Sequence, residues 1–217
     1  MTPDARPSMP NAVHQSTPVG SPHAAYAELH CLTNFTFLRG ASHPEELVER
    51  ASALGYTALA ITDECSMAGV VKAHIAAKRC QLKLIIGNEL ILEDGTKIIL
   101  LAKNRQGYGK LCHIITLARR RAKKGQYQVT LNDLKGSTDH LVAIWIPQHR
   151  ELLETGSRSS ALKTLFGEQL WLGAVRALDG FDHIRTQDLQ AIASAHTLPI
   201  VACGDVQMHA SNRKPLL

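Results

Sequence analysis

The segment Ala58-Leu59-Ala60-Ile61-Thr62-Asp63-Glu64 gives the clearest indication of the fold. It is an apolar run of small and branched residues that ends in two carboxylates. The run is too short for a helix and has no polar alternation, so it indicates a strand buried on both faces. Helical patterns flank it at residues 44–54 and 67–79. A strand between two helices is the repeating unit of a parallel α/β sheet or barrel, and such folds place their functional side chains at the carboxyl ends of the strands.

Further elements extend this pattern in both directions. Before the first helix, Ser42 is the expected N-cap, and Gly55 is expected to end that helix. Asp94-Gly95 predicts a hairpin-like turn. The other helices are expected at residues 107–124, 157–166 and 185–196. Seven strands are predicted in all, at residues 27–32, 57–62, 84–88, 98–102, 141–146, 170–175 and 199–203. This order favours a closed or nearly closed α/β barrel, with a doubly wound open sheet as the alternative.

The composition narrows the classes of protein to which the chain can belong. The 217 residues are 45% hydrophobic but only 5% aromatic, and the formal net charge of +5 permits an anionic partner without requiring one. An odd number of cysteines without a CxxC pair argues for a reduced, intracellular chain; they are Cys31, Cys65, Cys80, Cys112 and Cys203. No apolar run approaches the length of about 20 residues that a membrane span needs, and no signal-peptide core is present. We expect a cytoplasmic protein without a membrane partner.

Residues 1–25 differ from the rest of the chain. They are rich in proline, with scattered serine, threonine, glycine and histidine, and they have neither apolar period. Such a composition is typical of a disordered tail. The remaining residues, 26–217, are expected to form one domain.

The expected strand ends collect polar side chains of one kind. They offer His30, Asp63, Glu64, Glu89 and Asp205. Histidine and carboxylates that converge on one barrel mouth are ligand types for Zn, Mn or Fe, and several ions a few Å apart would support phosphoester hydrolysis. The alternative is that these residues cap strand ends by hydrogen bonds to loop backbone. No glycine-rich phosphate motif and no serine or cysteine nucleophile motif is present.

Several separated blocks occur in a fixed order along the chain. The blocks are Leu29-His30-Cys31-Leu32-Thr33-Asn34-Phe35-Thr36-Phe37-Leu38-Arg39-Gly40-Ala41-Ser42, Ala60-Ile61-Thr62-Asp63-Glu64, Gly87-Asn88-Glu89, Leu100-Leu101-Ala102-Lys103-Asn104-Arg105-Gln106-Gly107-Tyr108 and Gly204-Asp205-Val206-Gln207-Met208-His209. On these blocks the sequence resembles the polymerase-and-histidinol-phosphatase (PHP) domain found at the N-terminus of bacterial C-family DNA polymerases, and in particular that of the error-prone, translesion branch. The resemblance implies a distorted seven-stranded β/α (TIM-like) barrel.

The same resemblance indicates a degenerate metal site. Positions that hold metal ligands in many relatives are here Leu32, Arg39, Lys97 and Gln207, whereas His30, Asp63, Glu89 and Asp205 match the pattern and Glu64 is a possible substitute ligand. No residue of this chain is assigned a catalytic role. Residual Zn or Mn binding is an open possibility, and the Mg²⁺ of nucleotidyl transfer would belong to a polymerase core that this sequence lacks.

Two of the replacing residues are cations. Carboxylates that cluster without a metal repel each other, and burial raises their pKa values. We therefore hypothesise that Lys97 and Arg39 form ion pairs with Asp63, Glu89 and Asp205 in place of a metal cluster; the alternative is that both cations point to solvent. Strand alternation directs Cys31 away from His30 and into the core.

A basic run ends the helix expected at residues 107–124. It comprises Arg119, Arg120, Arg121, Lys123 and Lys124. Cations at a helix C-terminus oppose the negative end of the helix dipole, so the run has a purely structural interpretation. Contact with nucleic acid is the alternative interpretation.

The sequence is compatible with three functions. The first is the N-terminal domain of an error-prone DNA polymerase in damage-induced translesion synthesis, truncated before the polymerase core and inactive alone. Its partners would be the rest of the polymerase chain, DNA and other proteins of the mutasome. The second is a metal-dependent phosphoesterase or 3′–5′ exonuclease. The third is a non-catalytic interaction module that binds through the basic run.

Overall fold

The computed structural model describes residues 25–136, 138–147 and 155–216. In this part of the chain, seven strands form one sheet in the order of the sequence. The strands are β1 (Ala27–Glu28), β2 (Ala58–Ile61), β3 (Lys83–Ile91), β4 (Lys97–Ala102), β5 (Leu141–Ile146), β6 (Leu170–Val175) and β7 (Ile200–Cys203). The helices are α1 (Pro44–Ala53), α2 (Val70–Cys80), α3 (Arg105–Arg121), α4 (Thr155–Phe166) and α5 (Asp182–His196), with 3-10 turns η1 (Leu131–Leu134), η3 (Gly167–Gln169) and η4 (Ser211–Leu216).

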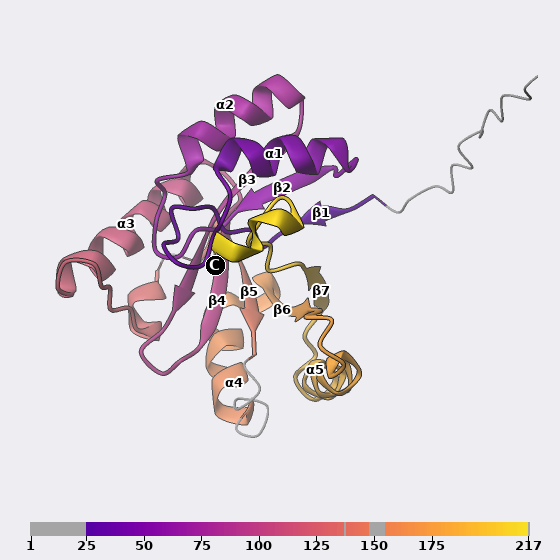
Figure 1. The fold of residues 1–217 in the computed structure, drawn as a ribbon. Helices are drawn as coiled ribbons and strands as arrows, with labels where there is room; N and C mark the ends of the chain where they lie inside the picture. Colours follow the sequence, from indigo (N-terminus) through magenta and orange to yellow (C-terminus); the bar gives the residue numbers. More distant parts are fainter. Residues whose placement is uncertain (1–24, 137, 148–154, 217) are drawn as a thin grey trace, which may run out of the picture.

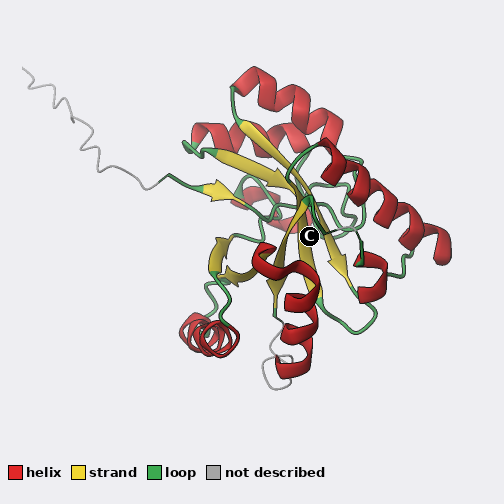
Figure 2. Cartoon of the chain, turned by 180° about the vertical axis from the view of Figure 1, so that it is seen from behind, coloured by secondary structure: helices red, strands yellow, loops and turns green. Residues whose placement is uncertain are grey.

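The sheet curls into a nearly closed barrel with the helices outside it (Figures 1 and 2). β4 runs antiparallel to β3 and β5, whereas the other neighbouring strands are parallel. The first and last parts of the sheet meet where the Leu32 amide donates to the Val206 carbonyl at 2.8 Å and the Val206 amide donates to the His30 carbonyl at 2.9 Å. These two bonds join the ends of the sheet.

The seven strands expected from the sequence are all present, and the barrel is confirmed in place of the open sheet. The hairpin at Gly95 is also confirmed, since β3 and β4 pair antiparallel across it. The first strand is shorter than expected, because the Glu28 carboxylate accepts the His30 amide at 2.9 Å in place of a ladder partner. The expectation that Ser42 caps α1 was wrong: His43 is the cap residue, directly before Pro44. Residues 1–24 of the expected tail lie outside the described residues.

Three apolar layers hold the barrel together, because alternate residues of each strand face opposite sides. The interior layer contains Ala60, Ile99, Leu101, Ile144, Ile146 and Cys203. A second layer packs α1 and α2 against β2, and it includes Cys31, as expected. The third packs α3, α4 and α5 against β3 to β6. The interior layer fills the barrel below its carboxyl-terminal mouth.

Candidate functional site at the barrel mouth

The strand directions bring a defined set of side chains to the mouth. Parallel strands end there, which places Asp63, Glu64 and Glu89 close together; Glu64 and Glu89 also form a parallel bridge. β4 runs the opposite way, so its first residue, Lys97, lies at the same end. Lys97 shares the inner face of β4 with Ile99 because residues two apart point to the same side.

His30, Glu89 and Asp205 form the centre of the mouth. His30 Nε2 lies 2.7 Å from Glu89 Oε2 and 3.4 Å from Asp205 Oδ1. One donor atom from each of the three residues lies within 4.8 Å of the others, so the group could hold a metal ion by geometry. His30 and Glu89 are fully buried, and the Asp205 side chain is 25% exposed.

Two cations contact the same carboxylates. Arg39 Nη1 lies 2.5 Å from Glu89 Oε1 and 2.5 Å from Glu64 Oε2, and Nη2 lies 3.3 Å from Glu89 Oε2. Lys97 Nζ lies 3.1 Å from Glu89 Oε2 and 3.6 Å from Asp205 Oδ2. Lys97 is only 8% exposed. Both cations therefore pair with carboxylates of the mouth, and 29% of the Arg39 side chain is also exposed to solvent.

Asp63 lies outside this network, contrary to the hypothesis from the sequence. Its oxygens accept hydrogen bonds from the Thr33 amide at 2.7 Å and from the hydroxyls of Thr33 and Thr36 at 2.7–3.0 Å. Glu64 pairs with Arg39 in its place and also accepts the Tyr127 hydroxyl at 2.7 Å. Asp63 thus fastens the loop after β1, whereas Glu64 joins the ion pairs.

These contacts determine which side chains at the mouth carry a charge. Burial alone would raise the pKa of Glu89, but hydrogen bonds from His30 and Arg39 and the charge of Lys97 hold it well below its usual range. Burial alone would lower the pKa of Arg39, but Glu89 and Glu64 raise it. Burial raises the pKa of Asp63, and its hydrogen bonds from Thr36 and Thr33 counter only part of that effect. Glu89 is therefore ionised and Arg39 is charged at neutral pH.

These contacts decide how well the mouth suits a resident metal. Both oxygens of Glu89 already accept from protein donors. A divalent ion between His30, Glu89 and Asp205 would lie beside Lys97, which adds Coulomb repulsion in a poorly solvated site. Asp205 Oδ1 and His30 Nδ1 are the buried atoms of this group without a hydrogen-bond partner. These two atoms could serve as ligands, but the positive charges of Arg39 and Lys97 would repel an ion bound there. The residues as arranged therefore do not fit a resident metal.

The basic run at the end of α3 divides into two kinds of residue. Arg119 donates to the Cys65 carbonyl at 3.1 and 3.2 Å, and its guanidinium lies 5.3 Å from the centre of the Tyr127 ring. Arg121 forms two hydrogen bonds to Asp133, at 2.7 and 2.8 Å. Three residues of the run are exposed with no ion pair described for them in the part of the chain that the structure covers, namely Arg120, Lys123 and Lys124.

Reasoning from the sequence missed Thr33, Thr36 and Tyr127. The two threonines lie in the loop after β1, and Tyr127 lies after α3. No periodic pattern marks such positions. A usable signal for the threonines was their place in the loop beside His30, since short hydroxyl side chains in loops often bond to neighbouring polar groups.

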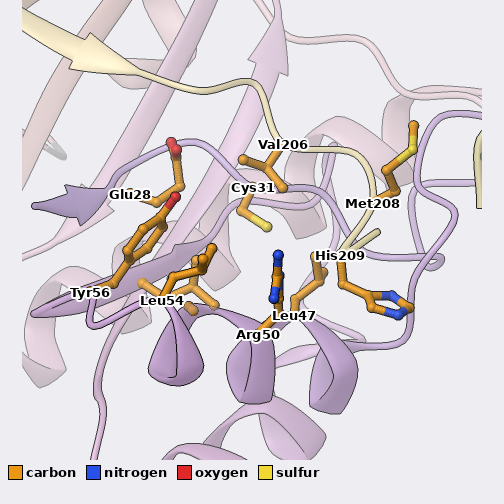
Figure 3. Close-up of a pocket in the computed structure, with 11 residues that line it drawn as sticks. Glu28, Cys31, Leu47, Arg50, Leu54, Tyr56, Val206, Met208 and His209 are labelled. Atoms are coloured by element: carbon orange, nitrogen blue, oxygen red, sulfur yellow. The ribbon is translucent and has the colours of Figure 1, made fainter. Parts of the chain in front are cut away.

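A separate hollow of about 160 Å³ lies outside the barrel, between α1 and the segment after β7 (Figure 3). Its wall includes Cys31, Leu47, Arg50 and Val206. Glu28 also borders it, but its carboxylate accepts from the Tyr26 hydroxyl and from the His30 and Gly204 amides. The hollow is therefore mostly apolar, and it is separate from the charged mouth.

Comparison with known proteins identifies the family. The PHP domain family matches residues 28–175, which is more than half of the chain, and the chain belongs to that family. Its curated relatives include the error-prone DNA polymerases of Methylococcus capsulatus, 52% identical over 197 residues, and of Pseudomonas aeruginosa, 49% identical over 194 residues. These alignments cover 90% and 89% of this chain but only 18% of either polymerase. The resemblance to the PHP domain of error-prone polymerases is thus confirmed.

Solved structures agree on the fold. A protein assigned as a metal-dependent phosphoesterase from Bifidobacterium adolescentis superposes with a TM-score of 0.57 at 18% identity, over 88% of this chain and 90% of that one. An amidohydrolase from Chromobacterium violaceum, with bound sulfate and no metal, gives a TM-score of 0.55 at 17% identity, over 85% and 88% of the two chains. Among the described residues, none of the helices is both long and apolar enough to span a membrane.

Proposed function

We propose that this chain is the PHP domain of an error-prone DNA polymerase that acts in translesion synthesis, and that the domain has a structural role. The names of the relatives at about half identity support the assignment to such a polymerase. The observation that carries the structural role is the pairing of Glu89 with Arg39 and Lys97. A phosphoesterase would need those carboxylate oxygens for metal ions.

The ion pairs give the mouth a role in folding. Glu89 would be an uncompensated buried charge without its partners, and loss of one partner from a buried pair is strongly destabilising. Arg39 connects the loop after β1 with β3, and Lys97 connects β4 with the segment after β7 through Asp205. The network therefore joins the first, middle and last parts of the barrel. No catalytic step is assigned to His30, Asp63, Glu64, Glu89 or Asp205.

A second candidate is a metal-dependent phosphoesterase or 3′–5′ exonuclease. It is favoured by the geometry of His30, Glu89 and Asp205 and by Asp205 Oδ1, a buried atom without a hydrogen-bond partner. A resident Zn or Mn would have to enter against Lys97 and Arg39. The third, a contact surface for nucleic acid or for mutasome proteins, is supported by the exposed Arg120, Lys123 and Lys124 only; Arg119 and Arg121 are engaged within the chain.

The test uses the full-length polymerase that contains this sequence, as wild type and as Asp205→Asn. Primer extension past a template lesion is measured together with nucleotide release from the primer 3′ end, with Mn or Zn added. The structural role requires that both proteins extend the primer at the same rate at a permissive temperature and that neither releases nucleotides through the mouth. Release by the wild type that Asp205→Asn abolishes would establish the exonuclease. A full-length protein without extension activity would refute the polymerase assignment.

A further inference from the structure

The loop after β1 combines a rigid base with an apolar tip. Thr33 and Thr36 bond to Asp63, Arg39 pairs with Glu89, and the Asn34 amide donates to the Ser42 carbonyl at 2.8 Å. A Cβ atom at Gly40 would lie 2.0 Å from the Thr33 carbonyl oxygen, so the base is also tightly packed. The base of the loop is thus held against the barrel by several independent contacts.

The tip presents large apolar side chains to solvent. Phe37 is 82% exposed and Leu38 is 70% exposed. Leu38 also has a φ of 61°, in the left-handed region that costs non-glycine residues conformational energy. An exposed leucine in a strained conformation contributes nothing to the stability of this chain by itself. Such strain points to a role for the side chain in a contact.

A hollow beside the tip extends the apolar surface. It measures about 270 Å³, and its wall combines Phe37, Leu38, Gly40, Ala41 and Leu216 with the polar residues Asn34, His43 and Arg213. Leu216 is 61% exposed. The η4 side is also fixed, because Arg213 pairs with Glu46 of α1 and the Ala41 amide donates to the Gln207 carbonyl at 2.8 Å. Two segments far apart in the sequence thus present exposed apolar side chains beside one hollow, and we name them the rim surface (Phe37, Leu38 and Leu216).

We propose that the rim surface is the contact through which this domain docks on the remaining body of the polymerase; this inference rests on the proposed function. The relatives contain more than five times the matched length, so most of such a protein lies outside the matched region. A few apolar side chains are too small a contact for a stable dimer, which buries about 1,200–2,000 Å². Within one chain, the covalent connection supplies a high effective concentration, so a small contact is sufficient.

The test compares hydrogen–deuterium exchange at residues 35–38 in the 217-residue chain and in the full-length polymerase. We expect exchange to be at least tenfold slower in the full-length protein, because docking covers the tip. Equal exchange in the two proteins overturns the proposal. A concentration-dependent dimer of the 217-residue chain that disappears on substitution of the rim surface also overturns it, since a second copy would then be the occupant.

Variants provide the matched control. Phe37→Ser/Leu38→Asn removes the apolar tip, and Asn accepts the left-handed backbone better than Leu. We expect this variant to leave the melting temperature of the 217-residue chain unchanged or raised, while proteolytic release of the domain from the full-length polymerase becomes at least tenfold faster. Val71→Ser/Ile75→Ser, on an exposed part of α2, should do neither. Equal release rates from the two full-length variants overturn the proposal. Primer extension by the full-length wild type reports on the proposed function separately.

Discussion

Glu89 accepts hydrogen bonds from His30 and Arg39 and forms an ion pair with Lys97, although its side chain is fully buried. A neutral amide at this position would keep the shape but remove the charge that balances Arg39 and Lys97. We expect Glu89→Gln to lower the free energy of unfolding by about 3 kcal/mol, in the range for broken buried ion pairs. Urea unfolding at neutral pH measures this. Glu93→Gln, on an exposed turn residue, is the control and should change stability little.

The Glu89 carboxylate also makes the stability of the fold depend on pH. The pKa of Glu89 is lowered in the folded chain, so its contribution to stability is present above the ordinary value of 4.5 and is lost as the pH falls below that value. Asp63 acts in the opposite direction, because burial raises its pKa and its protonation offsets part of the loss. We expect the urea midpoint to fall from pH 5 to pH 3 less steeply in Glu89→Gln than in the wild type. Equal slopes would contradict the assignment.

Some contacts of the mouth follow from the sequence, and others depend on the path of a loop. That His30, Glu89 and Asp205 meet follows from the rule that parallel strands end on one side. The exchange of roles between Asp63 and Glu64 did not follow, because the path of the loop after β1 decides which carboxylate meets Thr33 and which meets Arg39. Cys31 was placed in the core by strand alternation alone.

Within the secondary-structure elements and loops, two glycines are expected to respond to substitution by alanine in opposite ways. Gly40 closes the loop after β1, and a Cβ there would meet the Thr33 carbonyl oxygen at 2.0 Å. We expect Gly40→Ala to lower the free energy of unfolding by about 3 kcal/mol, the upper part of the usual range for overpacking. In α3, a Cβ at Gly109 would have no neighbour within 4 Å, so Gly109→Ala should stabilise by about 0.5–1 kcal/mol. Thermal unfolding of both variants checks the opposite signs.

The end of α3 gives a second prediction at this scale. Arg119 holds the Cys65 carbonyl and stacks on Tyr127, which in turn bonds Glu64 at the mouth. We expect Arg119→Ala to lower the free energy of unfolding by about 1–2 kcal/mol through the lost charged hydrogen bonds. Arg120→Ala, one position along and exposed, should stay within about 0.5 kcal/mol of the wild type. Chemical denaturation distinguishes the two variants. Equal losses of stability would contradict the division of the basic run into residues bonded within the chain and residues exposed to solvent.

Element types were predictable, whereas some boundaries were not. Apolar runs such as residues 141–146 identified the strands directly, and the observed β5 has the same bounds. The first strand was overestimated because a side chain, Glu28, took over a backbone partner. Helix α1 began one residue later than the Ser42 cap implied, since Pro44 sits at its first turn and His43 precedes it. Boundaries depend on such single hydrogen bonds, which composition does not reveal.

At the scale of the whole molecule, the barrel retains the PHP architecture while its mouth is filled by protein cations. Backbone pairing between the segment at Cys31 and that at Val206 and the ion pairs of Arg39 and Lys97 act at the same end of the barrel. The sequence allowed the barrel, the converging strand ends and both cations to be anticipated. The apolar rim surface was not anticipated, because an exposed leucine in a left-handed conformation has no signature in the sequence.

In the proposed structural role, the charges of Arg39 and Lys97 take the place of a metal ion beside Glu89 and Asp205. The metal content of the purified 217-residue chain tests this role; it is measured by mass spectrometry after dialysis against Zn, Mn or Fe without chelator or affinity-tag metal. We expect no stoichiometric metal, and the same content in a His30→Ala/Asp205→Ala variant. A near-stoichiometric ion in the wild type that the double variant loses would contradict the account.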